Sequence, residues 1–115
     1  MRFDLAVNSL VLDLYKTGRI TVYGRSNRRP FLHIKDAVRA YQMTIAAKKK
    51  TISGQIFNVG SDNQNYSIYD LAKETGDAVS NNYTLDAQDT PDNRSYGASF
   101  AKIRNSIGFE PKYTV

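Results

Sequence analysis

Cysteine is missing from this sequence and histidine occurs only once, and both facts exclude kinds of functional site. Without cysteine, the chain can form no thiolate nucleophile, no zinc–thiolate centre and no disulfide bond. With His33 alone, a zinc site that needs two histidines is excluded as well. No apolar run approaches the roughly 18 residues of a membrane-spanning helix, and the N-terminus lacks the apolar core of a signal peptide. We therefore expect a small soluble, cytoplasmic protein.

The residues that are present suit a folded domain with an uneven distribution of charge. Hydrophobic residues make up 41% of the 115 positions and charged residues 23%, which favours one domain with one core. Basic residues outnumber acidic ones by 16 to 11, for a net charge of +5. The stretch from Arg19 to Lys35 also contains Arg25, Arg28 and Arg29, and it has no acidic residue. Such a stretch suits a polyanion or a small ligand that bears phosphate.

Hydrophobic periodicity and turn residues predict alternating helices and short strands. Val7, Leu10, Val11 and Leu14 share one face of a first helix, which Gly18 would end. Further helices are expected over residues 36–50, 67–79 and 99–107, with Asp36, Ser67 and Ser99 as caps. Strands are expected over residues 19–23, 31–34, 55–59 and 83–85. This order predicts a small mixed α/β domain with about four helices and short strands, covering residues 1–115.

No self-sufficient catalytic set is found in the sequence. It contains no Gly-x-Ser-x-Gly elbow and neither of the standard glycine-rich phosphate loops. The acids Asp86, Asp89 and Asp92 do not follow the spacing of a calcium loop, and we interpret them as a solvated turn. We expect His33 to be a packed, hydrogen-bonded histidine. Arginine is then the side chain best suited to a phosphate-bearing ligand, because its guanidinium group binds two phosphate oxygens at once.

Several sequence blocks together resemble one enzyme superfamily. The blocks are Arg19-Ile-Thr-Val-Tyr-Gly24, Arg29-Pro-Phe-Leu-His-Ile-Lys-Asp36, Phe57-Asn-Val-Gly60 and Asp92-Asn-Arg-Ser-Tyr96, followed by Lys102-Ile-Arg and Gly108-Phe-Glu-Pro111. In this order they resemble the extended short-chain dehydrogenase/reductase superfamily, specifically its NAD-dependent nucleotide-sugar epimerases and dehydratases. The resemblance covers nearly the whole chain, but only the C-terminal, substrate-binding part of such an enzyme.

The resemblance implies a division of labour between this chain and a missing N-terminal Rossmann domain. In the family that domain holds NAD and supplies a Tyr-x-x-x-Lys pair for hydride transfer. The chain lacks a Rossmann domain, so we expect it to bind no cofactor and to be inactive by itself. Tyr69-Asp-Leu-Ala-Lys73 does fit the Tyr-x-x-x-Lys pattern, but it falls in a different helix from the family's catalytic one. We interpret it as a chance match.

Five positions correspond to the family's substrate contacts. Val22 and Tyr23 match the strand that lines the nucleotide base pocket, while Arg29 and Arg94 match the two arginines that contact the diphosphate. Asn8 lies in the helix that faces the nucleotide. One departure concerns the turn after the strand, where Gly24-Arg25-Ser26 replaces the family's common Gly-Asp-Gly.

The sequence thus predicts the substrate-binding part of an enzyme similar to UDP-glucose 4-epimerase, with a UDP- or dTDP-sugar as ligand. Because the opposing wall of the cleft is missing, we expect weak or undetectable binding by this chain alone. One alternative is a small basic nucleic-acid-binding module, although no helix-turn-helix or RNP-like motif is present. Another is a stand-alone interaction domain. An exposed apolar face, together with self-association or marginal stability, would agree with a missing partner domain.

Overall fold

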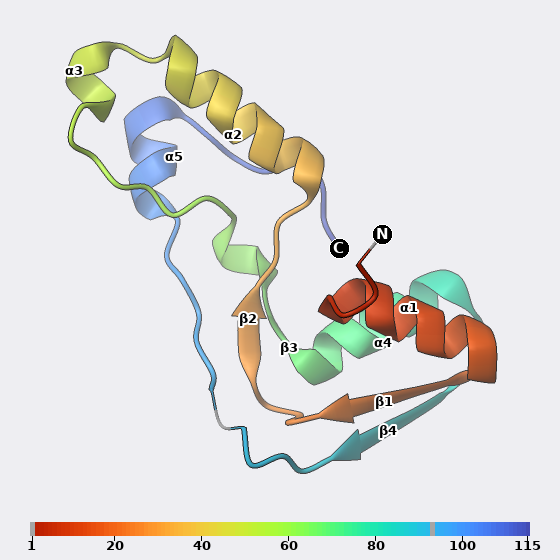
Figure 1. Cartoon of the computed structure of the whole chain (residues 1–115). Helices are drawn as coiled ribbons and strands as arrows, with labels where there is room; N and C mark the ends of the chain where they lie inside the picture. The colour runs from red at the N-terminus through yellow and green to blue at the C-terminus, as the bar shows by residue number, and fades with distance from the viewer. Residues whose placement is uncertain (1, 93) are drawn as a thin grey trace. The chain divides into compact units, whose positions relative to one another are not determined.

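The computed structural model describes residues 2–92 and 94–115, and it divides into two compact units (Figure 1). Unit 1 consists of Met1–Arg29 and Tyr66–Tyr96, and unit 2 of Pro30–Asn65 and Gly97–Val115. Buried hydrophobic residues occur in both units. Those of unit 1 are Leu10, Leu14, Ile20, Val22, Leu71 and Ala72. Those of unit 2 are Ala40, Phe100, Ile103 and Phe109.

Unit 1 is a parallel strand pair covered by two helices. Strand β1 (Arg19–Tyr23) pairs in parallel with β4 (Thr84–Gln88), so that Arg19 lies opposite Thr84 and Tyr23 opposite Gln88. Helices α1 (Ala6–Thr17) and α4 (Ile68–Val79) contact each other and β1 (Figure 1). Because side chains alternate along a strand, Ile20 and Val22 are buried while Arg19 and Tyr23 are exposed.

Both helices of unit 1 begin or end where the sequence predicted. Gly18 adopts a left-handed conformation with φ of 67°, and its N–H donates to the Leu14 carbonyl at 2.9 Å, which closes α1. At the start of α4, the Ser67 hydroxyl oxygen accepts from the Asp70 N–H at 3.0 Å. The same hydroxyl donates to the Asp70 carboxylate at 2.7 Å. The predicted capping box with a shorter acid is therefore confirmed.

Unit 2 contains three α-helices, of which one was not expected. Helix α2 (Ile34–Ala46) stops before the lysine cluster, and Lys49–Ile52 forms a separate short helix, α3. Ala47 has extended backbone with ψ of 154°, which interrupts the helical hydrogen-bond ladder between them. A 3₁₀ turn (Asp62–Gln64) and helix α5 (Ala101–Ile107) follow. The described residues thus form five α-helices in a mixed α/β fold.

Two strands lie elsewhere than expected. Strand β2 (Arg28–Pro30) pairs with β3 (Asn65–Ser67), a segment that the sequence analysis interpreted as loop. Residues 31–33 form no strand, and Ile34 already belongs to α2. His33 caps this helix, because its side chain accepts from the Lys35 N–H at 3.1 Å. Residues 55–59 are not a strand either, since no paired strand lies beside them in the described part of the chain.

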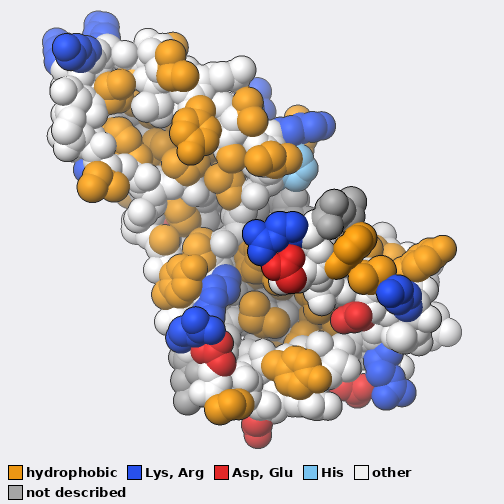
Figure 2. All heavy atoms as spheres, in the orientation of Figure 1, with side chains coloured by type: hydrophobic (Ala, Val, Ile, Leu, Met, Phe, Trp, Pro, Cys, Tyr) orange, Lys and Arg blue, Asp and Glu red, His pale blue; other side chains and the backbone are white. Residues whose placement is uncertain are grey.

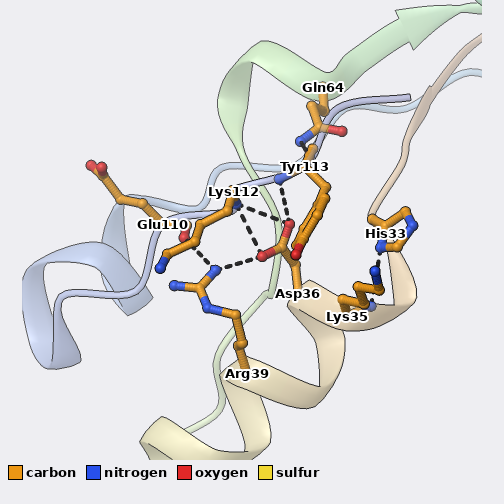
Figure 3. A network of polar contacts seen from close by, with 8 residues as sticks. All are labelled: His33, Lys35, Asp36, Arg39, Gln64, Glu110, Lys112 and Tyr113. Carbon is orange, nitrogen blue, oxygen red and sulfur yellow. Dashed lines mark hydrogen bonds and ion pairs between the residues drawn. The ribbon is translucent and has the colours of Figure 1, made fainter.

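Asp36 is buried in the first turn of α2, and its carboxylate binds the C-terminal segment (Figure 3). It accepts from the backbone N–H groups of Lys112 at 3.0 Å and Tyr113 at 2.9 Å. Arg39 donates to the same carboxylate at 2.5 Å and also to the Glu110 carbonyl at 3.2 Å. The expectation that Asp36 is the helix cap is therefore wrong. It attaches residues 110–113 to α2.

None of the helices formed by residues 2–92 and 94–115 is long and apolar enough to cross a membrane. The longest of them, α2, has 13 residues.

Candidate functional site

A pocket of about 340 Å³ lies within unit 1, and three of the five predicted contact residues line it. These are Val22 and Tyr23 at the end of β1, and Arg29 in β2. Helix α1 contributes Ser9 and Leu10 to another part of the wall. The volume falls at the lower end of the range for small-molecule sites, which is about 300 to 1,000 Å³.

The turn after β1 brings the strand and the basic loop to the same pocket. Gly24 has φ of 73°, its N–H donates to the Gln88 carbonyl at 3.0 Å, and its own carbonyl accepts from the Asn27 N–H at 2.9 Å. A Cβ atom at Gly24 would lie 2.4 Å from the Asn27 Nδ2 and 2.7 Å from the Thr90 Cγ2. Glycine is therefore needed at position 24.

Arg29 is half-buried and is positioned by two neighbours in unit 1. Its Nη1 donates to the Arg28 carbonyl at 2.8 Å, and its guanidinium carbon lies 5.0 Å from the centre of the Tyr96 ring. The Tyr96 N–H in turn donates to the Arg28 carbonyl at 3.1 Å. These contacts hold the guanidinium group of Arg29 close to the Tyr96 ring.

Arg94 does not line the pocket, but it binds a residue that does. Its Nε and Nη2 donate to the two carboxylate oxygens of Asp92 at 2.8 and 2.6 Å. The Arg94 side chain remains 83% exposed. These hydrogen bonds, with a further contribution from the charge of Arg29, hold the pKa of Asp92 well below its ordinary value.

Asn8 and Val22 differ in their surroundings from the other predicted contacts. The Asn8 side-chain amide donates to the Arg2 carbonyl at 2.8 Å, and the residue is next to Ser9, which lines the pocket. Val22 is 1% exposed, because its side chain belongs to the core of unit 1. Whether these five residues contact a ligand stays a prediction.

The sequence analysis missed most of the pocket wall, including Asn27 and Asp92. The Asn27 amide donates to the Asp92 carbonyl at 2.7 Å and so joins the loop after β1 to the loop after β4. Thr90 adds a second support, since its hydroxyl oxygen accepts from the Asp92 N–H at 3.2 Å. The sequence does show an asparagine in the basic loop. Its hydrogen-bond partner could not be predicted, because Asp92 lies 65 positions away. Asn93, within the predicted Asp92–Tyr96 block, lies outside the described residues.

The Tyr69 and Lys73 side chains of α4 have different partners. The Arg25 guanidinium carbon lies 4.0 Å from the centre of the Tyr69 ring. The Lys73 ammonium donates to Asp77 at 2.7 Å, and this hydrogen bond raises the pKa of Lys73. Neither contact brings the lysine to the tyrosine, which agrees with a chance sequence match.

The described residues contain no glycine-rich loop of the kind that binds the diphosphate of NAD at the start of a helix. Two of the four glycines with positive φ, Gly18 and Gly108, end helices, and none lies in a loop of the Gly-x-Gly-x-x-Gly type before a helix. Among residues 2–92 and 94–115, no three acidic or histidine side chains are grouped as a metal ion would require.

The basic stretch from Arg19 to Lys35 is divided between the two units. Arg19 lies 3.5 Å from Asp86, and Lys35 belongs to unit 2, where its ammonium group lies 5.3 Å from the centre of the Tyr113 ring. The alternative of a nucleic-acid-binding module remains untested.

Unit 2 exposes an apolar face on α2. Its members share one side of the helix and are largely accessible: Ile34 is 71% exposed, Val38 49%, Tyr41 74% and Ile45 82%. Ile56, in the expected strand that is unpaired here, is 85% exposed. We call these five residues the α2 face. Figure 2 shows many hydrophobic side chains over the surface of unit 2.

Comparisons with known proteins agree with the sequence blocks. Residues 4–60 match the sequence model of the NAD dependent epimerase/dehydratase family. The fold is similar to that of dTDP-glucose 4,6-dehydratase from Bacillus anthracis in complex with NAD, with a TM-score of 0.72 and 18% identity over 99% of this chain. It is also similar to RMD from Pseudomonas aeruginosa complexed with NADPH, with a TM-score of 0.70 and 21% identity over 99%.

A third similar structure is TunA, an NAD-dependent NDP-hexosamine 5,6-dehydratase involved in tunicamycin biosynthesis. Its TM-score is 0.65, with 22% identity over 96% of this chain. The chain spans only 36–39% of the length of these three proteins. The expected mixed α/β fold is confirmed, and the family match indicates a relationship to NAD-dependent epimerases and dehydratases.

Proposed function

We propose that this chain is the nucleotide-sugar-binding part of an NAD-dependent epimerase or dehydratase. The observation that carries the proposal is the unit 1 pocket, where the end of β1 and Arg29 meet. Tyr23 and the backbone around Val22 would form the wall for a nucleobase, and Arg29 would bind a phosphate oxygen of the ligand. The ligand class is a UDP- or dTDP-sugar.

In this proposal the chemistry on the sugar belongs to a part of the protein outside this chain. The residues described here supply binding and orientation, and the hydride-transferring residues and NAD would lie in a Rossmann domain. Two features support such a partner. The solved structures of similar fold are more than twice as long, and the α2 face exposes apolar area that a second domain could cover.

The proposal is tested by titrating the isotope-labelled chain with UDP and following backbone amide signals by NMR. We expect weak binding, with shifts concentrated around Tyr23, Asn27 and Arg29. Replacing Arg29 by Gln should weaken binding about tenfold or more, because a charge-assisted hydrogen bond is worth roughly 1.5–3 kcal/mol.

Arg19→Gln is the matched control, since Arg19 lies on the same strand as Tyr23 but does not line the pocket. Its affinity for UDP should equal that of the unmodified chain. Shifts confined to unit 2, or equal loss in both variants, would contradict this site. Submicromolar affinity would contradict the idea that half of the cleft is missing.

A further inference from the structure

We propose that Asp92 is a built-in counter-ion that occupies the phosphate position of the pocket and is displaced from Arg94 when the ligand binds. The proposal rests on the function proposed above and adds a residue that controls affinity. The observation behind the proposal is that the Asp92 residue lines the pocket while its carboxylate binds Arg94. Asp92 lines the pocket together with Arg29, and both of its oxygens are bound by Arg94.

The geometry of the Asp92–Arg94 pair matches that of an arginine bound to phosphate. Two hydrogen bonds of 2.8 and 2.6 Å join the Nε and Nη2 atoms of Arg94 to the two carboxylate oxygens of Asp92. A phosphate group offers two oxygens in a similar arrangement. The edge of Arg94 that a diphosphate would use is therefore already occupied by a side chain.

The backbone of Asp92 is fixed independently of its carboxylate. Asn27 binds its carbonyl, and Thr90 binds its N–H. Because these contacts use main-chain atoms, the carboxylate can release Arg94 without the loop losing its attachment to the turn after β1. The Arg94 side chain is 83% exposed and so has room to turn.

The charges explain why the displacement would favour a diphosphate. Asp92 offsets one of the two guanidinium charges of Arg29 and Arg94, and its low pKa keeps it ionised at any ordinary pH. A weakly charged ligand gains little by replacing it, whereas a group with two or more negative charges interacts favourably with both arginines. Asp92 thus lowers affinity and raises selectivity for multiply charged ligands.

The test uses inorganic pyrophosphate as the probe and the NMR signals of the arginine Nε–H groups as the readout. In the unmodified chain, pyrophosphate should move the Arg94 signal away from its Asp92-bound position. Asp92→Asn keeps an acceptor for the Arg94 Nε but removes the negative charge and the Oδ2 acceptor of Nη2. In this variant pyrophosphate should bind about two- to fivefold tighter, the range expected for removing an exposed ion pair. Asparagine keeps the Oδ1 atom that accepts from the Arg94 N–H at 3.1 Å.

Asp86→Asn is the matched control, because it removes the same charge from unit 1 but its partner is Arg19 at 3.5 Å. Its affinity should equal that of the unmodified chain. If the Asp92 variant binds equally or more weakly, or if pyrophosphate moves the Arg29 signal and leaves Arg94 unchanged, the counter-ion role is wrong. If pyrophosphate moves neither arginine in any variant, the proposed binding function itself fails, and the counter-ion role fails with it.

Discussion

Asp36 carries a negative charge in the interior of unit 2, where its side chain has no exposure to solvent. Burial alone would raise the pKa of this carboxyl, but hydrogen bonds from Lys112, Tyr113 and Arg39 outweigh it and leave the pKa below its ordinary value. The sequence showed an acid before a helical stretch and so predicted a cap. It could not show that backbone groups more than 70 positions away would reach this carboxylate.

Asp36→Asn should lower the free energy of unfolding by about 3 kcal/mol, because it leaves Arg39 without its partly buried partner. Urea denaturation measures this change, with Asp13→Asn on the exposed side of α1 as the control. The Asp36 contribution should also depend on pH. It is complete above the ordinary pKa of 3.8 and is lost as the pH falls through the lower value of the folded chain.

Stability against pH should therefore fall less steeply below pH 4 or so in Asp36→Asn than in the unmodified chain. The amide protons of Lys112 and Tyr113 should exchange faster in the variant, since their acceptor is weakened. Parallel pH profiles for the two chains would show that Asp36 does not couple protonation to folding.

Helices of this protein could be predicted from sequence with better accuracy than its strands. Local signals such as Gly18 and the Ser67 cap determine where a helix ends or begins, and both were placed correctly. A strand depends on a partner elsewhere in the chain. Residues 55–59 have a strand-like pattern, yet Phe57 and Val59 pack against the hydrophobic cluster of unit 2 without forming a ladder.

The same reasoning applies to the candidate site. Val22, Tyr23 and Arg29 were found together because they lie close in sequence around one turn. The pairing of Asp92 with Arg94, and of Asn27 with the Asp92 carbonyl, depends on side-chain rotamers and on a contact across 65 positions. Residue order alone does not contain that information.

At the level of the helix, Ser67→Ala should destabilise unit 1 by about 1 kcal/mol, because the Asp70 N–H loses its acceptor. Thermal unfolding followed by circular dichroism gives the change. Ser106→Ala is the matched control, since Ser106 is exposed within α5, where alanine is equal or better as a helix former. Equal effects of the two substitutions would argue against a capping role for Ser67.

At the scale of the whole molecule, the exposed α2 face is the feature that most strongly indicates a binding partner. Its five side chains are 49–85% exposed, and four of them share one side of a single helix. Exposed apolar side chains grouped on one side of a helix mark an interaction site or cause association.

We expect the isolated chain to self-associate through the α2 face in a concentration-dependent way. Ile45→Glu should weaken this association about tenfold or more, because an exposed contact would then have to bury a charge. Sedimentation velocity at several concentrations measures the effect. Tyr15→Glu on α1 is the control, because Tyr15 is 85% exposed but lies in unit 1. A monomer at all concentrations would argue against an uncovered docking face.

Each of the two units is built from two segments that are separated in the sequence, which limits how the gene could be truncated or recombined. The backbone passes from one unit to the other three times, after Arg29, Asn65 and Tyr96. No uninterrupted stretch of gene therefore encodes either unit, and no single truncation removes all of one unit without also removing part of the other. Neither half can be gained, lost or exchanged alone by one recombination event, so the two must be retained as a pair.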